Sequence, residues 1–358
     1  MKICILGSGL SALALAKALV NEKIYVDLLV KKKKINTNLS RTLGISKSNV
    51  KFFNNYIENI DDIIWKIKKI EVFSDNLQNE KLLNFEDKNH EIFSIVKNSN
   101  LSQILEKNLC KSIYFSKINL IKKINFLKEY NLVINTDYSN EITKRYFSKK
   151  FTKKYNSYAY TTIIEHDKCR NEVATQIFTK RGPIAFLPIS SKETSIVYSL
   201  NNPNYQSEQT IKNLIDVYNC NYKINKINKV NFFELNSLNL RSYYKGKILA
   251  FGDLLHRIHP LAGQGFNMTI RDIKILISII KEKKSLGLQI DSSVNSEFQK
   301  KSKHKNLIFS NGIDLIYQFF NIERQFKNNL ISKSVKFLGN NSLANKMFTR
   351  IADKGLLF

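Results

Sequence analysis

A short glycine-containing turn near the N-terminus carries the clearest chemical signal in this sequence. Gly7, Gly9 and Ala12 form a GxGxxA pattern between a predicted strand, Lys2–Leu6, and an Ala/Leu-rich predicted helix that leads to a second strand, Tyr25–Val30. In such a βαβ unit the first glycine permits the tight turn, the second leaves room for a pyrophosphate, and the small third residue lets the helix approach the strand. The helix amides then face the phosphates. The pattern predicts a dinucleotide site.

A second group of residues follows a buried strand that we predict over residues 246–253. Asp253 ends this strand, at the position where an open α/β sheet presents polar groups to a ligand. Gly263 and Gly265 allow the backbone to approach a flat ring, and the helix that follows, to about Lys281, directs its positive N-terminal end toward that ring. A cofactor that becomes anionic when it is reduced would be stabilised there.

Two histidines lie between the aspartate and the glycines, and both invite a catalytic or metal-binding interpretation. His256 and His259 have no carboxylate or cysteine partners at the spacing of metal ligands, so we predict no metal site. His259 more simply shapes the turn before Pro260, and Asp253 could alternatively cap a helix. No residue can be identified from the sequence as the catalytic acid or base. The cysteines are too far apart for a CxxC pair and indicate a reducing compartment: Cys4, Cys110, Cys169 and Cys220.

The segment from Gly252 to Asp272 carries a family resemblance. It reads GDLLHRIHPLAGQGFNMTIRD and resembles the second flavin-binding motif of FAD-dependent aromatic-ring monooxygenases, in particular the branch that hydroxylates polyprenylated phenols in ubiquinone biosynthesis. The HPxxGQGxN core is its most specific part. Supporting matches occur along most of the chain: GSGLSA from Gly7, RTLGIS from Arg41, IEH from Ile164, QIFT from Gln176, GPIAFLP from Gly182 and NGIDLIY from Asn311.

The resemblance implies an α/β fold like that of para-hydroxybenzoate hydroxylase, with a Rossmann-like FAD-binding domain, an inserted antiparallel-sheet substrate domain and a helical C-terminus. Short strand-like runs separated by turn residues in the middle of the chain agree with an antiparallel sheet. We divide the chain accordingly into FAD-binding parts at 1–69, 92–150 and 244–290, substrate-domain strands at 70–91, the substrate domain at 151–243, and a helical region at 291–358.

Two segments of the first part have a local pattern of their own. Residues 51–69 form an amphipathic stretch that we predict to be helical, with the only tryptophan, Trp65, packed in the core. Residues 41–46 are predicted to be a turn that leads into a helix.

The resemblance also implies where FAD would be held. The first turn would bind the pyrophosphate, Arg41 would reach the flavin from the loop after the second strand, and Gln103 would approach it from a helix over Asn100–Leu109. Asp253 would bind the ribityl hydroxyls, and the segment after His259 would line the isoalloxazine ring. The full set of predicted cofactor contacts is Gly7, Gly9, Ala12, Arg41, Gln103, Asp253, Pro260, Gly263, Gln264, Gly265 and Asn267.

The sequence departs from the family pattern at two positions. Relatives usually end the second strand with an acidic residue that binds the adenosine ribose, whereas this chain has Val30 followed by Lys31. The loss of such a charged hydrogen bond costs about 1.5–3 kcal/mol of affinity unless other groups replace it. Relatives also carry an Asp-Gly pair after the strand at 131–135, where this chain has Asp137 and Tyr138. This change bears on access of a pyridine nucleotide.

The implied activity is hydroxylation of a polyprenylated phenol in ubiquinone biosynthesis. Reduced FAD would react with O2 to form a flavin hydroperoxide, which transfers oxygen to the ring in a site that excludes water. The reductant would be NAD(P)H or a protein electron donor. Apolar residues such as Ile184–Leu187 could wall the substrate pocket, although core packing explains them equally well. The alternatives are a related flavin-dependent reductase and a non-catalytic or divergent FAD-binding protein that acts as a scaffold of a quinone-biosynthesis complex.

Charge and hydropathy limit the partners and the location. The 358 residues include 57 Lys and Arg against 30 Asp and Glu, a formal net charge of +27. The lysines are scattered, without the basic stripe and interleaved aromatics that nucleic-acid binding requires, so we expect no nucleic acid. The N-terminus opens on a strand and does not resemble a signal peptide, and no apolar run reaches membrane-spanning length. We therefore expect a cytoplasmic protein with peripheral contact to an anionic membrane through 307–358, or to other quinone-biosynthesis proteins.

Overall fold

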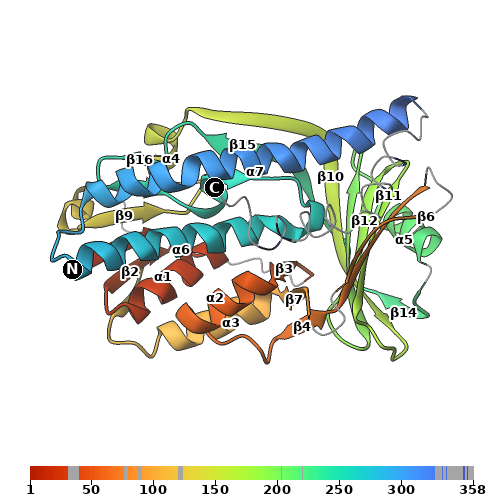
Figure 1. Cartoon of the computed structure of the whole chain (residues 1–358), viewed down its shortest axis with the longest axis horizontal. Helices are drawn as coiled ribbons and strands as arrows, with labels where there is room; N and C mark the ends of the chain where they lie inside the picture. Colours follow the sequence, from red (N-terminus) through yellow and green to blue (C-terminus); the bar gives the residue numbers. More distant parts are fainter. Residues whose placement is uncertain are drawn as a thin grey trace.

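The computed structural model describes most of the chain, and three sheets organise it (Figure 1). The described residues are 1–30, 40–75, 80–86, 91–119, 124–202, 204–219 and 221–326, together with Lys333, Lys336, Arg350 and Asp353.

The first sheet is the predicted nucleotide-binding sheet, and its strand order is β16-β17-β9-β1-β2-β8. The strands from β17 to β8 are parallel, and β16 joins the edge in the antiparallel direction. Their bounds are Lys2–Leu6 (β1), Tyr25–Val30 (β2), Phe115–Asn119 (β8), Leu132–Asn135 (β9), Tyr244–Lys245 (β16) and Ile248–Ala250 (β17). The helix Leu10–Asn21 (α1) connects β1 to β2, which confirms the predicted βαβ unit.

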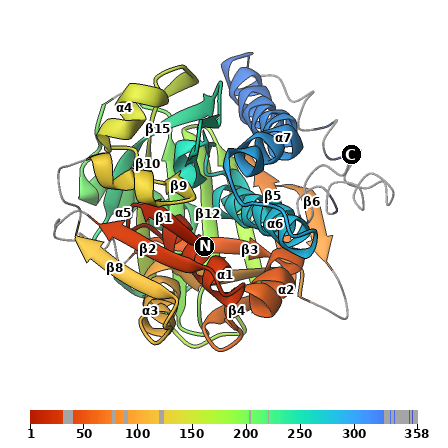
Figure 2. The same ribbon diagram turned by 90° about the vertical axis from the view of Figure 1, so that its left-hand side faces the viewer.

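Helices cover this sheet and bury its apolar strands in the largest core of the protein. α1 lies between α3 and α6, and α7 runs beside α6 along the outside of the molecule (Figures 1 and 2). The helices are Lys47–Tyr56 (α2), Asn98–Leu109 (α3), Glu141–Tyr146 (α4), Glu208–Tyr218 (α5), Gln264–Ser285 (α6) and Ser292–Phe326 (α7), with short 3-10 turns at Ile124–Glu129, Gly252–Leu254 and Leu261–Gly263.

The second sheet has nine strands and forms the other end of the molecule (Figure 1). Its order is β18-β15-β10-β13-β12-β11-β5-β6, with β14 beside β10. Every pair is antiparallel except β5 with β11, which are parallel. The bounds are Lys69–Ser74 (β5), Glu80–Glu86 (β6), Lys150–His166 (β10), Val173–Thr179 (β11), Gly182–Pro188 (β12), Glu193–Leu200 (β13), Ile224–Ile227 (β14), Asn231–Leu240 (β15) and His256–Arg257 (β18).

A small third sheet lies between the parallel sheet and the nine-stranded sheet. Two predictions about its residues are wrong. Its strands are Thr42–Ser46 (β3), Ile64–Ile67 (β4) and Phe93–Lys97 (β7), in the order β3-β7-β4. Residues 42–46 are therefore a strand, whereas a turn was predicted. The hydroxyls of Thr42 and Ser195 lie 2.8 Å apart, so β3 contacts the face of the nine-stranded sheet.

The predicted helix over residues 51–69 is wrong in its second half. The helix ends at Tyr56, the side chain of Asn54 then accepts a hydrogen bond from the amide of Ile60, and Trp65 lies in β4. Pairing with β7 supplies the hydrogen bonds of β4, and the Trp65 indole donates to the carbonyl of Asn171 at 2.6 Å. Tertiary pairing thus overrides the local helical spacing.

Candidate functional site

The turn after β1 has the geometry that its sequence predicts. Gly7 has φ +123°, and a Cβ at this position would lie 2.3 Å from Thr136 Oγ1, whose hydroxyl donates to the carbonyl of Leu6. A side chain at position 7 would therefore clash with the protein itself, whether or not a cofactor is bound. At Gly9 an added Cβ would have no neighbour within 4 Å among the residues that the structure describes, so the space beside the start of α1 is open with respect to them. Ala12 is fully buried against the sheet, as close packing of α1 requires.

The end of β17 lies against the start of α1. Gly252 has φ +66°, and a Cβ there would be 2.7 Å from Cβ of Ser11. Asp253 follows directly and is exposed. The two motifs are far apart in sequence, yet β1 and β17, which flank β9, bring them to the same end of the parallel sheet.

The HPLAGQGFN segment forms the turn into α6. Gly263 has φ +62°, and a Cβ there would be 3.4 Å from the amide nitrogen of Gly44 in β3. At Gly265 an added Cβ would have no neighbour within 4 Å in the described part of the chain. Gly263, Gly265 and Pro260 are all partly exposed. The segment thus packs on β3 at Gly263 and leaves open space at Gly265.

Asn267 holds this turn in place. Its side chain is fully buried; Oδ1 accepts from the Ser46 amide at 2.9 Å and from Asn49 Nδ2 at 2.8 Å. Its Nδ2 donates to the carbonyls of Gly44 at 3.0 Å and Gly263 at 3.3 Å. The amide therefore ties α6 to β3 and α2, a positioning role that the motif alone does not reveal.

The remaining predicted contacts lie on neighbouring elements. Arg41 is exposed directly before β3, and its carbonyl accepts from the amide of Asn98 at the start of α3. Gln103 is exposed on that same helix. Gln264 is buried, and its Oε1 accepts from Arg271 Nη2 at 3.3 Å. Gln264 thus bonds within α6.

The two departures from the family pattern lie near the same edge of the sheet. Val30 ends β2 and is buried, while Lys31 falls outside the described residues. Tyr138 is 46% exposed, and its hydroxyl accepts from Lys150 Nζ at 2.7 Å. This hydrogen bond lowers the pKa of Tyr138. The guanidinium of Arg257 lies 5.3 Å from the centre of the Tyr138 ring.

One face of the nine-stranded sheet is turned toward the segment that leads into β3. Thr161 pairs with Val197, Val197 with Ala185, and Ala185 with Gln176, so one row of residues crosses four strands. Thr161 Oγ1 lies 3.2 Å from the hydroxyl of Ser40, which shows that this face is directed toward β3. The last three residues of the row are partly exposed. Solvent therefore reaches this part of the sheet face.

The predicted wall Ile184–Leu187 is split between the two faces of β12. Ile184 is fully buried and packs with Tyr198 in the outer core that α5 covers. Leu187 packs with Phe93 on the inner side. Because side chains alternate along a strand, only Ala185 and Leu187 of this segment face the loops.

Both histidines are buried, but only one has hydrogen-bond partners. His256 Nε2 lies 2.6 Å from Asp272 Oδ2, and Asn306 Nδ2 donates to the other oxygen, so this group links β18, α6 and α7. His259 packs between Tyr155 and Tyr317, and neither of its ring nitrogens has a partner among the described residues. Burial lowers the pKa of His259 to about 3, so the ring is neutral at physiological pH.

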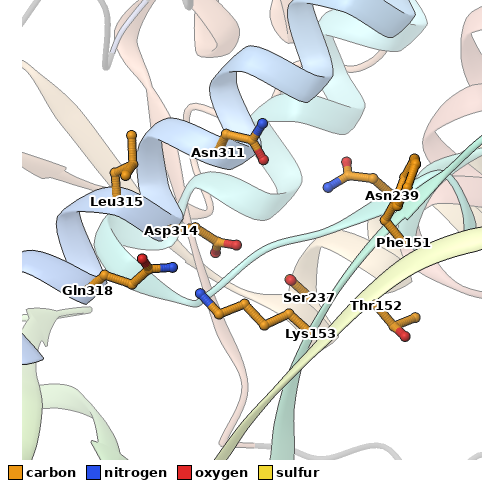
Figure 3. A pocket seen from close by; sticks show the side chains of 9 residues that line it. All are labelled: Phe151, Thr152, Lys153, Ser237, Asn239, Asn311, Asp314, Leu315 and Gln318. Carbon is orange, nitrogen blue, oxygen red and sulfur yellow. The ribbon is translucent and has the colours of Figure 1, made fainter.

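A separate groove of about 470 Å³ lies between β10, β15 and α7 (Figure 3). Lys153 extends along it toward α7, and Asp314 accepts a hydrogen bond from the Tyr155 hydroxyl. Burial, followed by this carboxylate, raises the pKa of Tyr155. None of the predicted cofactor residues lines this groove, whose lining is Phe151, Thr152, Lys153, Ser237, Asn239, Asn311, Asp314, Leu315 and Gln318.

Comparisons with known proteins agree with this geometry. A family model described as the FAD binding domain matches residues 162–284. The Escherichia coli 3-demethoxyubiquinol 3-hydroxylase is 29% identical over 179 residues, which is 46% of this chain and 44% of the relative. The Drosophila melanogaster mitochondrial ubiquinone biosynthesis monooxygenase COQ6 is 23% identical over 232 residues, 53% of this chain and 49% of the relative. This chain is related to the FAD-dependent aromatic-ring monooxygenases. The aligned part spans about half the length of these curated relatives.

Solved monooxygenase structures confirm the fold over nearly the whole chain. The p-nitrophenol 4-monooxygenase PnpA from Pseudomonas putida superimposes with a TM-score of 0.78, at 11% identity, and 98% of this chain and 97% of that one are covered. Klebsiella pneumoniae HpxO, in a complex with FAD, gives 0.76 at 13% identity with 99% of both chains covered. The predicted fold is therefore confirmed, and α7 gives it a helical region near the C-terminus. Of the predicted helical region 291–358, the part after Phe326 lies outside the described residues, apart from Lys333, Lys336, Arg350 and Asp353. Within the described residues, no helix is both long and apolar enough to span a membrane.

Proposed function

We propose that this chain binds FAD non-covalently along the edge of the parallel sheet. The observation that carries the proposal is the convergence of the two motifs, since Gly252 packs on Ser11 and leaves Asp253 exposed beside the first turn of α1. The residues present fit the cofactor. Space is open beside Gly9 and Gly265, where FAD would require backbone without side chains.

Each part of the edge suits a different part of FAD. The backbone from Gly7 to Ala12 and the positive end of α1 would hold the pyrophosphate. The Asp253 carboxylate would accept hydrogen bonds from the ribityl hydroxyls, and the turn from Pro260 to Asn267 would lie along the isoalloxazine ring, with Arg41 and Gln103 approaching from their own elements. The N-terminus of α6 would stabilise negative charge on that ring.

We further propose that the protein is an FAD-dependent monooxygenase that hydroxylates a polyprenylated phenol in ubiquinone biosynthesis. Bound FAD, once reduced by NAD(P)H or a protein donor, supplies the activation of O2. The row of Thr161, Val197, Ala185 and Gln176 crosses the face of the nine-stranded sheet that is turned toward β3, and we propose that it forms one wall of the substrate site. The wall and the loops would exclude water from the reacting ring. This substrate class is supported by similarity to the 3-demethoxyubiquinol 3-hydroxylase and to the ubiquinone biosynthesis monooxygenase COQ6.

Complementation tests the activity. Expression of the chain in a host that lacks one ring hydroxylase should restore ubiquinone, and Gly265→Trp should abolish the rescue because its side chain fills the open space. Thermal unfolding checks that this variant is folded. Soluble, FAD-loaded wild-type protein that rescues none of the ring-hydroxylation mutants would contradict the hydroxylase proposal.

Asp253 offers a test of the cofactor alone. Because Asp253 is exposed, Asp253→Ala should leave the stability of the apoprotein within about 0.5 kcal/mol. The variant should bind FAD about tenfold more weakly, since a hydrogen bond to a charged group is worth about 1.5–3 kcal/mol. Flavin fluorescence titration measures the affinity, and Asp61→Ala, on an exposed turn, is the matched control.

A non-catalytic FAD-binding protein is the second candidate, because Val30 lacks the ribose-binding carboxylate and Tyr138 replaces glycine in the loop next to the site. The hydrogen bond from Lys150 fixes the Tyr138 side chain against β10. Such a protein would take up FAD but would form no hydroxylated phenol with any reductant. Product analysis after incubation with a prenylated phenol, O2 and NADPH, NADH or a chemical reductant therefore separates the two candidates.

A further inference from the structure

The second half of α7 carries large apolar side chains that face solvent. Leu315, Ile316, Phe319 and Ile322 are 50%, 46%, 49% and 44% exposed. Their spacing of one, three and three residues places them on one side of the helix. We call these four residues the α7 stripe. Single exposed apolar residues are ordinary, but four within two turns mark an interaction surface.

Exposed basic residues precede the stripe on the same helix. Lys300, Lys301 and Lys305 are exposed. At helical spacing, positions 301 and 305 lie on the same side of α7 as positions 312, 316 and 319. The acidic neighbour Glu297 is paired with Lys301 at 2.7 Å. The first half of α7 therefore carries an excess of exposed basic residues, although Lys301 is also paired with Glu282 at 3.6 Å, and the second half carries the apolar stripe.

The opposite side of α7 anchors the stripe to the protein. Phe320 stacks on Phe178 of the nine-stranded sheet, with ring centres 3.7 Å apart. The Tyr317 hydroxyl donates to Asn201 Oδ1 at 2.6 Å. The nearby carboxylate of Asp314 accepts a hydrogen bond from the Tyr155 hydroxyl. The helix is thus fixed along the outside of the molecule, as Figures 1 and 2 show. The stripe is exposed on the side that does not pack on the sheet.

We propose that this side of α7 docks the protein on an anionic lipid bilayer. The α7 stripe enters the headgroup region, and the basic half of the helix lies on anionic headgroups, as in amphipathic helices that lie in the plane of a membrane. The groove beside the stripe adds Phe151, 60% exposed, and Lys153 to the same surface, because Leu315 lines that groove (Figure 3).

Charge favours a bilayer over a second copy of the chain. The formal net charge of +27 makes two copies repel each other, while it attracts a surface of anionic lipids. The inference extends the proposed function, since a polyprenylated substrate resides in a bilayer. It rests on the exposed residues of α7, and its test needs no substrate and no turnover.

Vesicle sedimentation tests the apolar half. The full chain should sediment with phosphatidylcholine vesicles that contain phosphatidylglycerol at low salt. Leu315→Gln combined with Phe319→Gln should weaken this binding about tenfold or more, because the apolar insertion is lost. The matched control is Ile113→Gln with Val217→Gln, at side chains 82% and 72% exposed elsewhere, which should bind as the wild type does.

A second pair of variants tests the basic half. Lys300→Gln with Lys305→Gln should reduce binding to the anionic vesicles, whereas Lys168→Gln with Lys192→Gln, two exposed lysines outside α7, removes the same charge and should have a smaller effect. Thermal unfolding confirms that each variant is folded.

The proposal has clear failure outcomes. It is overturned if the wild type stays in solution with anionic vesicles at low salt, if pure phosphatidylcholine binds it equally well, or if the stripe variant binds like its control. A wild type that elutes as a dimer whose stripe variant is monomeric would assign the surface to a second copy instead. FAD uptake and ubiquinone rescue by the same preparations report separately on the proposed function.

Discussion

The two sides of the candidate site differ in what determines their residues. On the parallel-sheet side, Gly7, Gly252 and Gly263 all have positive φ, and a side chain at the first two would collide with neighbouring residues. On the antiparallel-sheet side, Ala185 and Val197 lie in regular strands whose conformation any residue with high β propensity adopts. Backbone geometry therefore determines which residues are tolerated on the parallel-sheet side, whereas side-chain size determines this on the antiparallel-sheet side.

On the parallel-sheet side, we expect substitution of a glycine that contacts other residues to lower both the free energy of unfolding and the affinity for FAD. Substitution of a glycine beside open space should lower the affinity for FAD alone. Gly7→Val should destabilise the apoprotein by about 4 kcal/mol, since it combines a strained backbone with a clash at Thr136. Urea unfolding measures the loss. Gly9→Ala is the matched variant: its added Cβ meets open space, so stability should change by less than about 1 kcal/mol while FAD affinity falls. Equal destabilisation by both variants would remove the distinction.

Asn267 should show that part of the flavin motif acts through the fold. Asn267→Ala leaves the buried amide of Ser46 and the carbonyl of Gly44 without their partner, which should cost about 3 kcal/mol in the apoprotein. Guanidinium unfolding without FAD measures this loss. Pro260→Ala, in the same motif but partly exposed, should cost far less. An Asn267 variant with wild-type stability and weak FAD binding would instead assign its side chain to the cofactor.

His259 should make the site region sensitive to acid. Its pKa in the folded protein is about 3, below the value of about 6.5 in an unfolded chain, so between these values the unfolded state binds more protons. Stability should therefore fall as the pH drops below 6.5, by at most about 1.4 kcal/mol per pH unit from this group. Urea unfolding from pH 7 to pH 4 follows the effect. His259→Phe keeps a ring between the two tyrosines and should flatten the profile; an unchanged profile would contradict the assignment.

The smallest effect is expected on the antiparallel-sheet side. Ala185→Val adds two methyl groups to a partly exposed position in a strand, so stability should change by less than about 1 kcal/mol and FAD uptake should be unaffected. If the row that includes Ala185 contacts the substrate, KM or the choice of prenyl length should change while the flavin spectrum does not. Steady-state assays with two prenyl lengths measure this. Weaker FAD binding in this variant would show that the two sides are not separate.

The same contrast explains how much could be predicted from the sequence. Three features were predictable: the βαβ unit, the convergence of the Gly7 turn with Asp253, and the inserted antiparallel sheet. The glycines mark tight turns in the sequence, and the family resemblance brings the two motifs to one site. The end of α2 was not, because residues 51–69 keep helical spacing while β7 draws Trp65 into a strand.

The role of Asn267 also lay beyond prediction. Its four hydrogen bonds join segments from β3, α2 and α6, and no local pattern shows where those segments meet. The α7 stripe needed the structure for a similar reason, since only burial of Tyr317 and Phe320 shows which side of the helix is left exposed.

The strand order of the parallel sheet has a consequence for the order of events during synthesis. β9 pairs with β1 on one edge, but its other edge is covered only by β17, more than a hundred residues later in the chain. Until residues 248–250 leave the ribosome, the apolar strand Leu132–Asn135 has an unpaired edge open to other chains. The parallel sheet of this protein is therefore completed late, after the whole antiparallel sheet apart from the short strand β18 has been made.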